Sequence, residues 1–236
     1  MREFQVAQDK DIDASPEQVW DALTLGTSGW LWPNEYEPRV GGAATGGSVV
    51  TAWDPPHHLV VRTEGPSGWF NELDQTVTAT QSGSRLRWVH SGVFVEDWAG
   101  QYDGVAEHTD FYLHTLAEYV AHFAGRTAVW STANGPAASV APDGLTRLRA
   151  ALGLADDAAV GDRVLVALPS GTAEAVVDYV HPHFVGLRTA EQLVRVFGRN
   201  AFGAPVGVAV HDFATDAAPA ERTQAAWEQW LAGVYA

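Results

Sequence analysis

The first residues that could do chemistry lie on an alternating segment, residues 84–91. Leu86, Trp88 and His90 share one side of a strand with a period of two, and Arg85, Arg87 and Val89 share the other side. We expect the arginine side to face solvent and His90 to point inward, where desolvation lowers the pKa of an imidazole. His90 could then serve as a neutral acid/base or as a hydrogen-bonding group for a ligand. The alternative is a structural histidine that bonds a backbone carbonyl at the strand end.

A second set of polar aromatic residues lies on the longest helical pattern, residues 105–123. His108, Tyr112 and Tyr119 fall at one edge of its apolar face. Aromatic side chains with polar tips can hold the oxygen atoms of a ligand in an otherwise apolar pocket. Core residues whose tips reach the surface would give the same pattern, so both interpretations stay open.

Metal chemistry has one candidate, the i, i+4, i+8 set His114, Glu118 and His122. These residues lie with Glu107 and Asp110 on the side of the helix away from the expected sheet, which favours a solvated face over a zinc site. The chain has no cysteine, which excludes thiolate ligands, thiolate nucleophiles and disulfides. We expect no metal and no cofactor. No serine, carboxylate or histidine set forms a recognisable catalytic unit.

Tryptophan is concentrated in the first half, where seven of the ten tryptophans precede residue 126. Large rigid aromatic surfaces favour a wide core or a lined cavity. The candidates for a cavity wall are Trp20, Trp53, Trp69 and Trp88, although each could belong to a plain core. A contact of Arg62 with Glu72 inside such a cavity would be a functional indication, whereas an outward-facing pair would not.

The elements that position these residues follow from local signals. Ser15, Pro16 and Glu17 mark a helix start, with an N-cap, a proline at the first position and an acid at the positive end of the dipole. Strand-like segments then follow between short turns, at residues 48–53, 58–63, 69–80 and 84–91. With the long helix, they predict an α+β fold in which a curved antiparallel sheet wraps around a long C-terminal helix.

Charge divides the 236-residue chain unevenly. Residues 1–125 carry 18 acids and 6 bases, a charge of −12, and the remainder carries 11 acids and 8 bases, a charge of −3. Residues 126–142 are small and nearly uncharged, and we expect them to be a linker between a first domain, 1–125, and a second, 143–236.

The order of expected elements in the second half indicates a shortened copy of the first. Its expected elements include a short helix at residues 190–197, and residues 49–63 and 176–189 share a Val-Val start, a Pro-His turn and a closing Arg-Thr. About 93 residues are few for a complete copy. We therefore expect a degenerate or truncated domain that serves as a packing partner.

Four ordered segments, residues 12–24, 32–43, 53–62 and 83–93, resemble the START-like helix-grip superfamily (SRPBCC), in its branch of activator of heat-shock-protein-90 ATPase homologues. This resemblance implies an antiparallel sheet that grips the long helix, with an apolar cavity between them. The sequence departs from the family at the start of that helix, where a Gly-Trp pair is usual and residues 107–111 read EHTDF.

The favoured function is binding of a small hydrophobic or aromatic ligand in an apolar cavity, with no catalysis demonstrable from the sequence. One alternative is a polyketide cyclase/dehydratase-like enzyme that uses His90 and His108 as acid and base. Another is a co-chaperone-like interaction module whose acidic exterior meets a protein partner, or a homodimer.

The overall charge of −15 and the lack of a basic run exclude a phosphate-backbone surface, so we expect no nucleic-acid partner. No apolar stretch approaches the roughly 18 residues of a membrane helix, and the N-terminus lacks the apolar core of a secretory signal. We expect no membrane partner and a cytoplasmic location.

Overall fold

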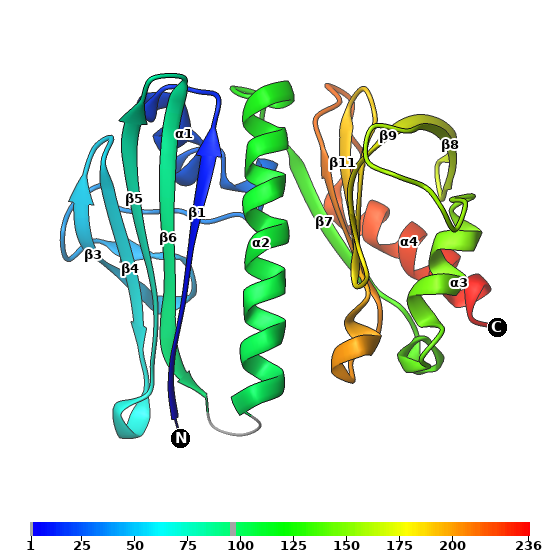
Figure 1. Ribbon diagram of the computed structural model, residues 1–236, viewed down its shortest axis with the longest axis horizontal. Helices are drawn as coiled ribbons and strands as arrows, with labels where there is room; N and C mark the ends of the chain where they lie inside the picture. Colours follow the sequence, from blue (N-terminus) through cyan, green and yellow to red (C-terminus); the bar gives the residue numbers. More distant parts are fainter. Residues whose placement is uncertain (1, 95–97) are drawn as a thin grey trace. The chain divides into compact units, whose positions relative to one another are not determined.

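The computed structural model describes residues 2–94 and 98–236 and divides the chain into two units, Met1–Gly125 and Arg126–Ala236 (Figure 1). Each is α+β, with a six-stranded antiparallel sheet. Within the described ranges, no helix has the length and apolar character needed to cross a membrane.

The first unit contains, in chain order, β1 (Arg2–Ile12), α1 (Pro16–Thr24), η1 (Thr27–Gly29), β2 (Ala43–Ala44), η2 (Thr45–Gly47), β3 (Ser48–Asp54), β4 (His58–Glu64), η3 (Pro66–Gly68), β5 (Phe70–Thr80), β6 (Gly83–Phe94) and α2 (Trp98–Phe123). Its sheet has the order β1-β6-β5-β4-β3-β2, in which the first strand pairs with the last. The helix α2 begins before residue 105, the start predicted from the sequence.

Helix α1 forms where the sequence predicts it. The Ser15 side chain accepts from the Gln18 backbone N–H, the Gln18 side chain returns a bond to the Ser15 N–H, and Pro16 occupies the first turn. Val19 and Trp20 on its buried side fix the helix against the sheet.

Strand alternation gives the first sheet two different faces. The inner face packs against α1 and α2, and Trp30, directly after η1, meets Trp88 of β6. The Gln8 side chain contacts α2, because its Nε2 donates to the Ala106 carbonyl at 2.8 Å. The outer face carries the exposed pair Asp11 and Arg85, 2.8 Å apart. The predicted facing of residues 84–91, with the arginines outward and His90 inward, is confirmed.

Arg62 and Glu72 do meet, at 3.1 Å, but on the outer face, where Arg62 also pairs with Glu64 and lies over the ring of Phe70. The inward-facing residues beside them are Val61, Thr63, Asn71 and Leu73. The pair therefore does not line a cavity, and the functional indication that it would have given is withdrawn.

The second unit contains β7 (Val129–Asn134), η4 (Ala137–Val140), α3 (Gly144–Ala151), β8 (Arg163–Leu168), β9 (Gly171–His181), β10 (Phe184–Arg188), β11 (Gln192–Phe197), η5 (Arg199–Phe202), β12 (Gly207–Asp212) and α4 (Ala220–Val234). Its sheet order, β7-β12-β11-β10-β9-β8, repeats that of the first unit strand for strand. Both units also run strand, short helix, five strands, helix.

Three expectations about the second half need correction. Residues 126–142 are not a linker, because they contain β7 and η4. The small side chains Ser131 and Ala133 that suggested a linker face the core, since β7 pairs with β12 and contacts α4. Residues 190–197 are not a helix, because their continuous apolar run is the central strand β11.

The third correction concerns the reduced copy, since every strand of the first sheet has a counterpart in the second. The related segments 49–63 and 176–189 fall on the hairpins β3–β4 and β9–β10, which hold equivalent positions in the two sheets. The second unit is shorter because several of its strands and its last helix are shorter: α4 spans 15 residues, against 26 in α2. Its buried core lies between the sheet and helices α3 and α4.

Candidate functional site

The inner face of the first sheet is built from rows of residues that strand pairing sets side by side. One row contains Gln8, Trp88, Gln75, Leu59 and Trp53. The next contains Val6, His90, Leu73, Val61 and Val50. A third contains Phe4, Gly92, Asn71 and Thr63, and Ser48 joins it through a hydrogen bond of 2.6 Å to Thr63.

Burial differs between these rows. Leu59, Gln75 and Trp88 of the first row are at most 5% exposed. Leu73 and Asn71, on the same strand as Gln75, are only half-buried. In the second and third rows Phe4, Val6 and Val50 are buried as well, whereas the half-buried members are Val61, Thr63, Asn71, Leu73 and His90. These five residues form the more open end of the inner face.

The polar centre of this open end is a pair formed by His90 and Asn71. The His90 Nε2 lies 2.8 Å from the Asn71 Nδ2, and the edge of the Phe4 ring meets the imidazole at a centroid distance of 5.0 Å. Burial lowers the pKa of His90 from 6.5 to about 4. The imidazole is neutral at ordinary pH, so its Nε2 accepts a hydrogen bond from the amide.

Two tryptophans at the closed end meet edge to face but differ in hydrogen bonding. The rings of Trp30 and Trp88 are 6.0 Å apart. The indole N–H of Trp30 donates to the Ala22 carbonyl at 2.9 Å, whereas that of Trp88 is buried and has no hydrogen-bond partner in the described part of the chain. Trp88 therefore brings a buried polar donor into an apolar environment.

An aromatic cluster lies on the same inner face, at the β3 end of the first row. The rings of Trp20 and Trp53 lie 5.1 Å apart, and the Tyr36 ring lies 6.5 Å from Trp53. Val50 and Leu59 complete the cluster. Burial raises the pKa of the Tyr36 hydroxyl to about 12, so this wall is apolar and uncharged.

The helix residues divide into two groups. His108 bonds the Gly104 carbonyl of its own helix through Nδ1 at 2.7 Å, and its ring lies 6.2 Å from that of Tyr112. Tyr112 in turn meets Trp32 edge to face at 5.9 Å. Tyr119, by contrast, is a packing residue.

Tyr119 covers two glycines of the segment around η1. A Cβ on Gly26 would lie 2.5 Å from the Tyr119 hydroxyl oxygen, and one on Gly29 would overlap the same ring. Burial raises the pKa of Tyr119, and a hydrogen bond with the Gly125 backbone opposes this effect. Glycine is needed at both positions because the ring lies against the backbone.

Among the ring contacts of the described residues, none joins Trp69 to another candidate. Trp69 follows η3 in the turn between β4 and β5, where a Cβ on Gly65 would be 2.8 Å from its ring. The structure thus brings Trp20 together with Trp53, and His108 with Tyr112. The described contacts of His90 are with Phe4 and Asn71 and do not include His108, so they give no support to an acid–base pair of the two imidazoles.

Phe4 and Asn71 were missed by the sequence reasoning. Asn71 lies on a strand that was predicted, and a period of two places it on the face of Leu73. Phe4 lies on β1, for which no strand was predicted although Phe4 and Val6 alternate with polar neighbours. The histidine–amide contact itself depends on strand register, which a single sequence does not reveal.

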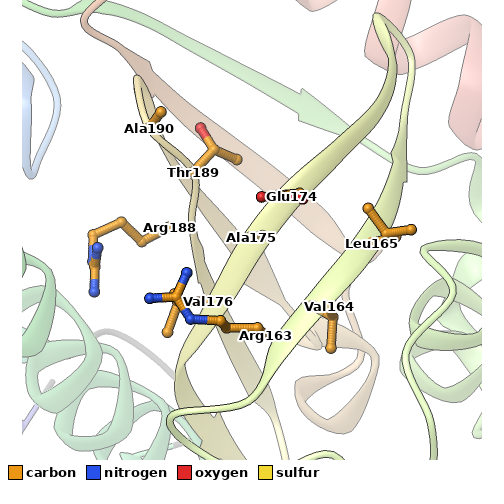
Figure 2. A pocket seen from close by; sticks show the side chains of 9 residues that line it. All are labelled: Arg163, Val164, Leu165, Glu174, Ala175, Val176, Arg188, Thr189 and Ala190. Atoms are coloured by element: carbon orange, nitrogen blue, oxygen red, sulfur yellow. The ribbon is translucent and has the colours of Figure 1, made fainter.

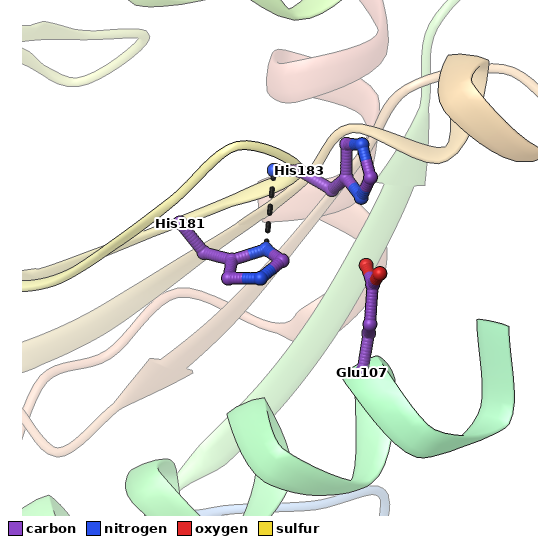
Figure 3. Close-up of side chains that lie close together, drawn as sticks. All are labelled: Glu107, His181 and His183. Carbon is purple, nitrogen blue, oxygen red and sulfur yellow. Dashed lines mark hydrogen bonds between the residues drawn. The ribbon is translucent and has the colours of Figure 1, made fainter. Parts of the chain in front are cut away.

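In the metal candidate on α2, Glu118 and His122 approach to 3.6 Å, with side chains that are 19% and 40% exposed. The third residue, His114, has its Nε2 buried, so the set is not the solvated face that was expected. In the second unit, His181 and His183 flank the β9–β10 turn, where the His183 N–H donates to the His181 Nδ1 at 3.3 Å (Figure 3). That bond and their ring contact at 5.5 Å stabilise the turn.

The second unit also has a surface pocket of about 470 Å³ (Figure 2). Its lining residues are Arg163, Val164, Leu165, Glu174, Ala175, Val176, Arg188, Thr189 and Ala190. Strand pairing sets Arg163 and Arg188 on either side of Val176, on the face opposite the α3–α4 core. Charged groups and exposed Leu165 make it a surface feature, unlike the enclosed cavity expected for the first unit.

Comparisons with known proteins give structural neighbours only. No protein-family model and no curated protein matches the chain. A solved protein of Mesorhizobium loti is 24% identical, with a TM-score of 0.44 over 51% of this chain and 98% of that one.

Two further neighbours are CalU16 of Micromonospora echinospora and DynU16, a protein of the dynemicin biosynthetic locus. CalU16 is 18% identical over 50% of this chain and 76% of its own, with a TM-score of 0.40. DynU16 is 12% identical over 98% of this chain and 95% of its own, with a TM-score of 0.45. At these scores the fold rests on the strand orders described above.

Proposed function

We propose that the first unit is a START-like helix-grip domain that binds a small hydrophobic or aromatic molecule on its inner face, without catalysis. The observation that carries the proposal is the open end of that face, where His90 and Asn71 lie beside the half-buried apolar residues Leu73 and Val61. A polar pair next to apolar surface is the usual composition of a small-molecule site.

The expected affinity is moderate. An aromatic ligand the size of a tryptophan side chain buries about 150–250 Å², which yields about 4–6 kcal/mol of transfer free energy. Loss of translational and rotational freedom opposes this gain. We therefore expect a dissociation constant in the micromolar to millimolar range for a simple bicyclic aromatic molecule.

Native mass spectrometry of the purified full chain, with 1-naphthol added as probe, tests the proposal. We expect one bound probe per chain. The Leu73→Asp variant should lose it, because a charge then lies on the inner face, whereas Thr78→Asp, on the outward side of the same strand, should retain it.

A second variant separates loss of binding from loss of fold. Leu73→Trp keeps the position apolar and fills the space beside His90, so the variant should melt like the wild type and still lose the probe. Equal binding by the wild type, Leu73→Asp and Leu73→Trp would place the ligand elsewhere and refute the proposal.

A further inference from the structure

The surface pocket of the second unit combines cationic and apolar walls (Figure 2). Its volume of about 470 Å³ lies in the range of small-molecule sites. Among the described residues that line it, Arg163 and Arg188 are cationic and Glu174 is anionic. The pocket is therefore net positive, although the chain as a whole carries a charge of −15.

Strand pairing brings the two arginines to one place. Arg163 of β8 and Arg188 of β10 are both register partners of Val176, which lies on β9 between them. Neighbouring strands are about 4.8 Å apart, so the two α-carbons are about 10 Å apart and their side chains share one face. Figure 2 shows the Arg163 side chain extending from β8 across β9, next to Val176. Both guanidinium groups can therefore reach one anionic group held above Val176.

The charge of Arg163 is not neutralised by a carboxylate of the protein. Its side chain is exposed and takes part in no ion pair or hydrogen bond within the described ranges. Glu174 lies opposite Leu165, one step further along the sheet, and the same ranges contain no ion pair between it and Arg163. A guanidinium in this state presents a planar set of N–H donors that matches the two oxygens of a carboxylate.

The remainder of the pocket offers apolar surface. Leu165 lies two residues after Arg163 on the same side of β8, and it is 65% exposed. Val176 forms the half-buried floor between the arginines. An alkyl chain or a ring that extends from the anionic group towards Leu165 would cover both side chains, and each Å² of apolar area removed from water contributes about 25 cal/mol.

Glu174 limits the charge that a ligand can carry here, because its carboxylate repels a second negative group. We infer that this pocket binds a small organic monoanion: Arg163 and Arg188 hold its carboxylate above Val176, and its apolar chain or ring lies along Leu165. The inference concerns the second unit and does not depend on the ligand site proposed for the first.

Isothermal titration of the full chain at pH 7 with three eight-carbon probes tests the inference. The probes are octanoate, the uncharged 1-octanol, and octylammonium, which has the opposite charge. We expect octanoate to bind about 3- to 10-fold more tightly than the alcohol, the effect of a charge-assisted interaction at an exposed site. Octylammonium should bind at least about 10-fold more weakly than octanoate. Raising NaCl from about 0.05 M to about 0.5 M should remove most of the preference for the anion.

Variants locate this preference in the pocket. Arg163→Gln and Arg188→Gln should each lower the octanoate affinity by about 3- to 10-fold and leave that of 1-octanol unchanged. Glu174→Gln, which removes a nearby negative charge, should raise the octanoate affinity by about 2- to 4-fold. Arg222→Gln removes the same charge from an exposed position on α4, outside the pocket, and is the matched control.

Two further measurements separate this site from the one proposed in the first unit. Leu73→Trp, which should lose 1-naphthol, should bind octanoate like the wild type. Arg163→Gln should bind 1-naphthol like the wild type. Loss of octanoate binding in Leu73→Trp would place the octanoate site in the first unit and overturn the inference.

The octanoate titrations also decide the inference by themselves. Equal octanoate affinities in the wild type, Arg163→Gln and Arg188→Gln would overturn it, as would equal binding of octanoate and 1-octanol by the wild type. A wild type that binds no octanoate would refute it as well, and the proposed function of the first unit would then still depend only on the 1-naphthol result.

Discussion

His90 shows how a single residue acquires its properties from neighbours distant in sequence. Strand alternation alone predicts that it points inward. Its neutral state and orientation come from Phe4, 86 positions earlier in the chain, and from Asn71 on the adjacent strand. The direction of the His90 side chain follows from the local period of its strand. Its contacts with Asn71 and Phe4 depend on strand register and on β1, a strand that was not predicted.

The pKa of His90 makes stability depend on pH. In the unfolded chain an imidazole takes up a proton near pH 6.5, whereas folded His90 does so only near pH 4. As the pH falls from 6.5 to 4, the unfolded state therefore gains protons first, and the free energy of unfolding should drop by about 1–3 kcal/mol from this group.

Urea unfolding of the wild type and His90→Gln at pH values between 4 and 7 measures this contribution. The variant should show a shallower fall, while His57→Gln, which changes an exposed histidine, should follow the wild type. Identical slopes for the wild type and His90→Gln would show that His90 is not desolvated.

Gly29 should not tolerate a side chain, because the Tyr119 ring occupies the space of a Cβ. Gly29→Ala should lower the free energy of unfolding by about 1–3 kcal/mol. Gly233→Ala, in the last turn of α4 with nothing near its Cβ, should instead be neutral or stabilising by up to about 1 kcal/mol. Thermal melts check both values, and equal melting temperatures for the two variants would contradict the packing of Tyr119.

At the scale of elements, the second sheet contains a buried ion pair that forms only because Gly186 of β10 has no side chain. Asp178 of β9 and Arg195 of β11 form a buried ion pair at 2.5 Å, although β10 lies between their strands. The pair crosses β10 at Gly186, where a Cβ would overlap both charged groups. A strand with any other residue at this position would separate the charges.

Breaking this pair should be costly. Asp178→Asn leaves a buried guanidinium without its counter-charge, and the free energy of unfolding should fall by about 3–5 kcal/mol. Gly186→Ala should have a loss of similar size, whereas Glu174→Gln, exposed on the same strand as Asp178, should stay within about 0.5 kcal/mol of the wild type. Chemical denaturation measures all three, and a neutral effect of Gly186→Ala would contradict the crossing.

The elements also show where sequence patterns mislead. Helix α1 and strands β3 to β6 were predicted because caps, turns and alternation agree locally. Strand β7 was mistaken for a linker, because Ser131 and Ala133 are small for reasons of packing. Strand β11 was mistaken for a helix, because burial of both sheet faces removes the alternation that identifies a strand.

At the scale of the whole molecule, one topology occurs twice with different chemistry. Both sheets have the order first, sixth, fifth, fourth, third, second. The first unit carries most of the negative charge and seven of the ten tryptophans, and strands β3 to β6 of its sheet project their Asp, Glu and Arg side chains outward. The second unit has a tightly filled core and a buried ion pair. The first unit is therefore the one in which we propose ligand binding on the inner face of the sheet.

Histidine NMR of the full chain during a titration with 2-naphthol tests this proposal most directly. The His90 ring signals, identified by their loss in His90→Gln, should shift saturably as the probe is added. Those of His57, which is exposed at the turn before β4, should stay in place. Saturable binding of 2-naphthol without any shift of the His90 signals would contradict a ligand site on the inner face.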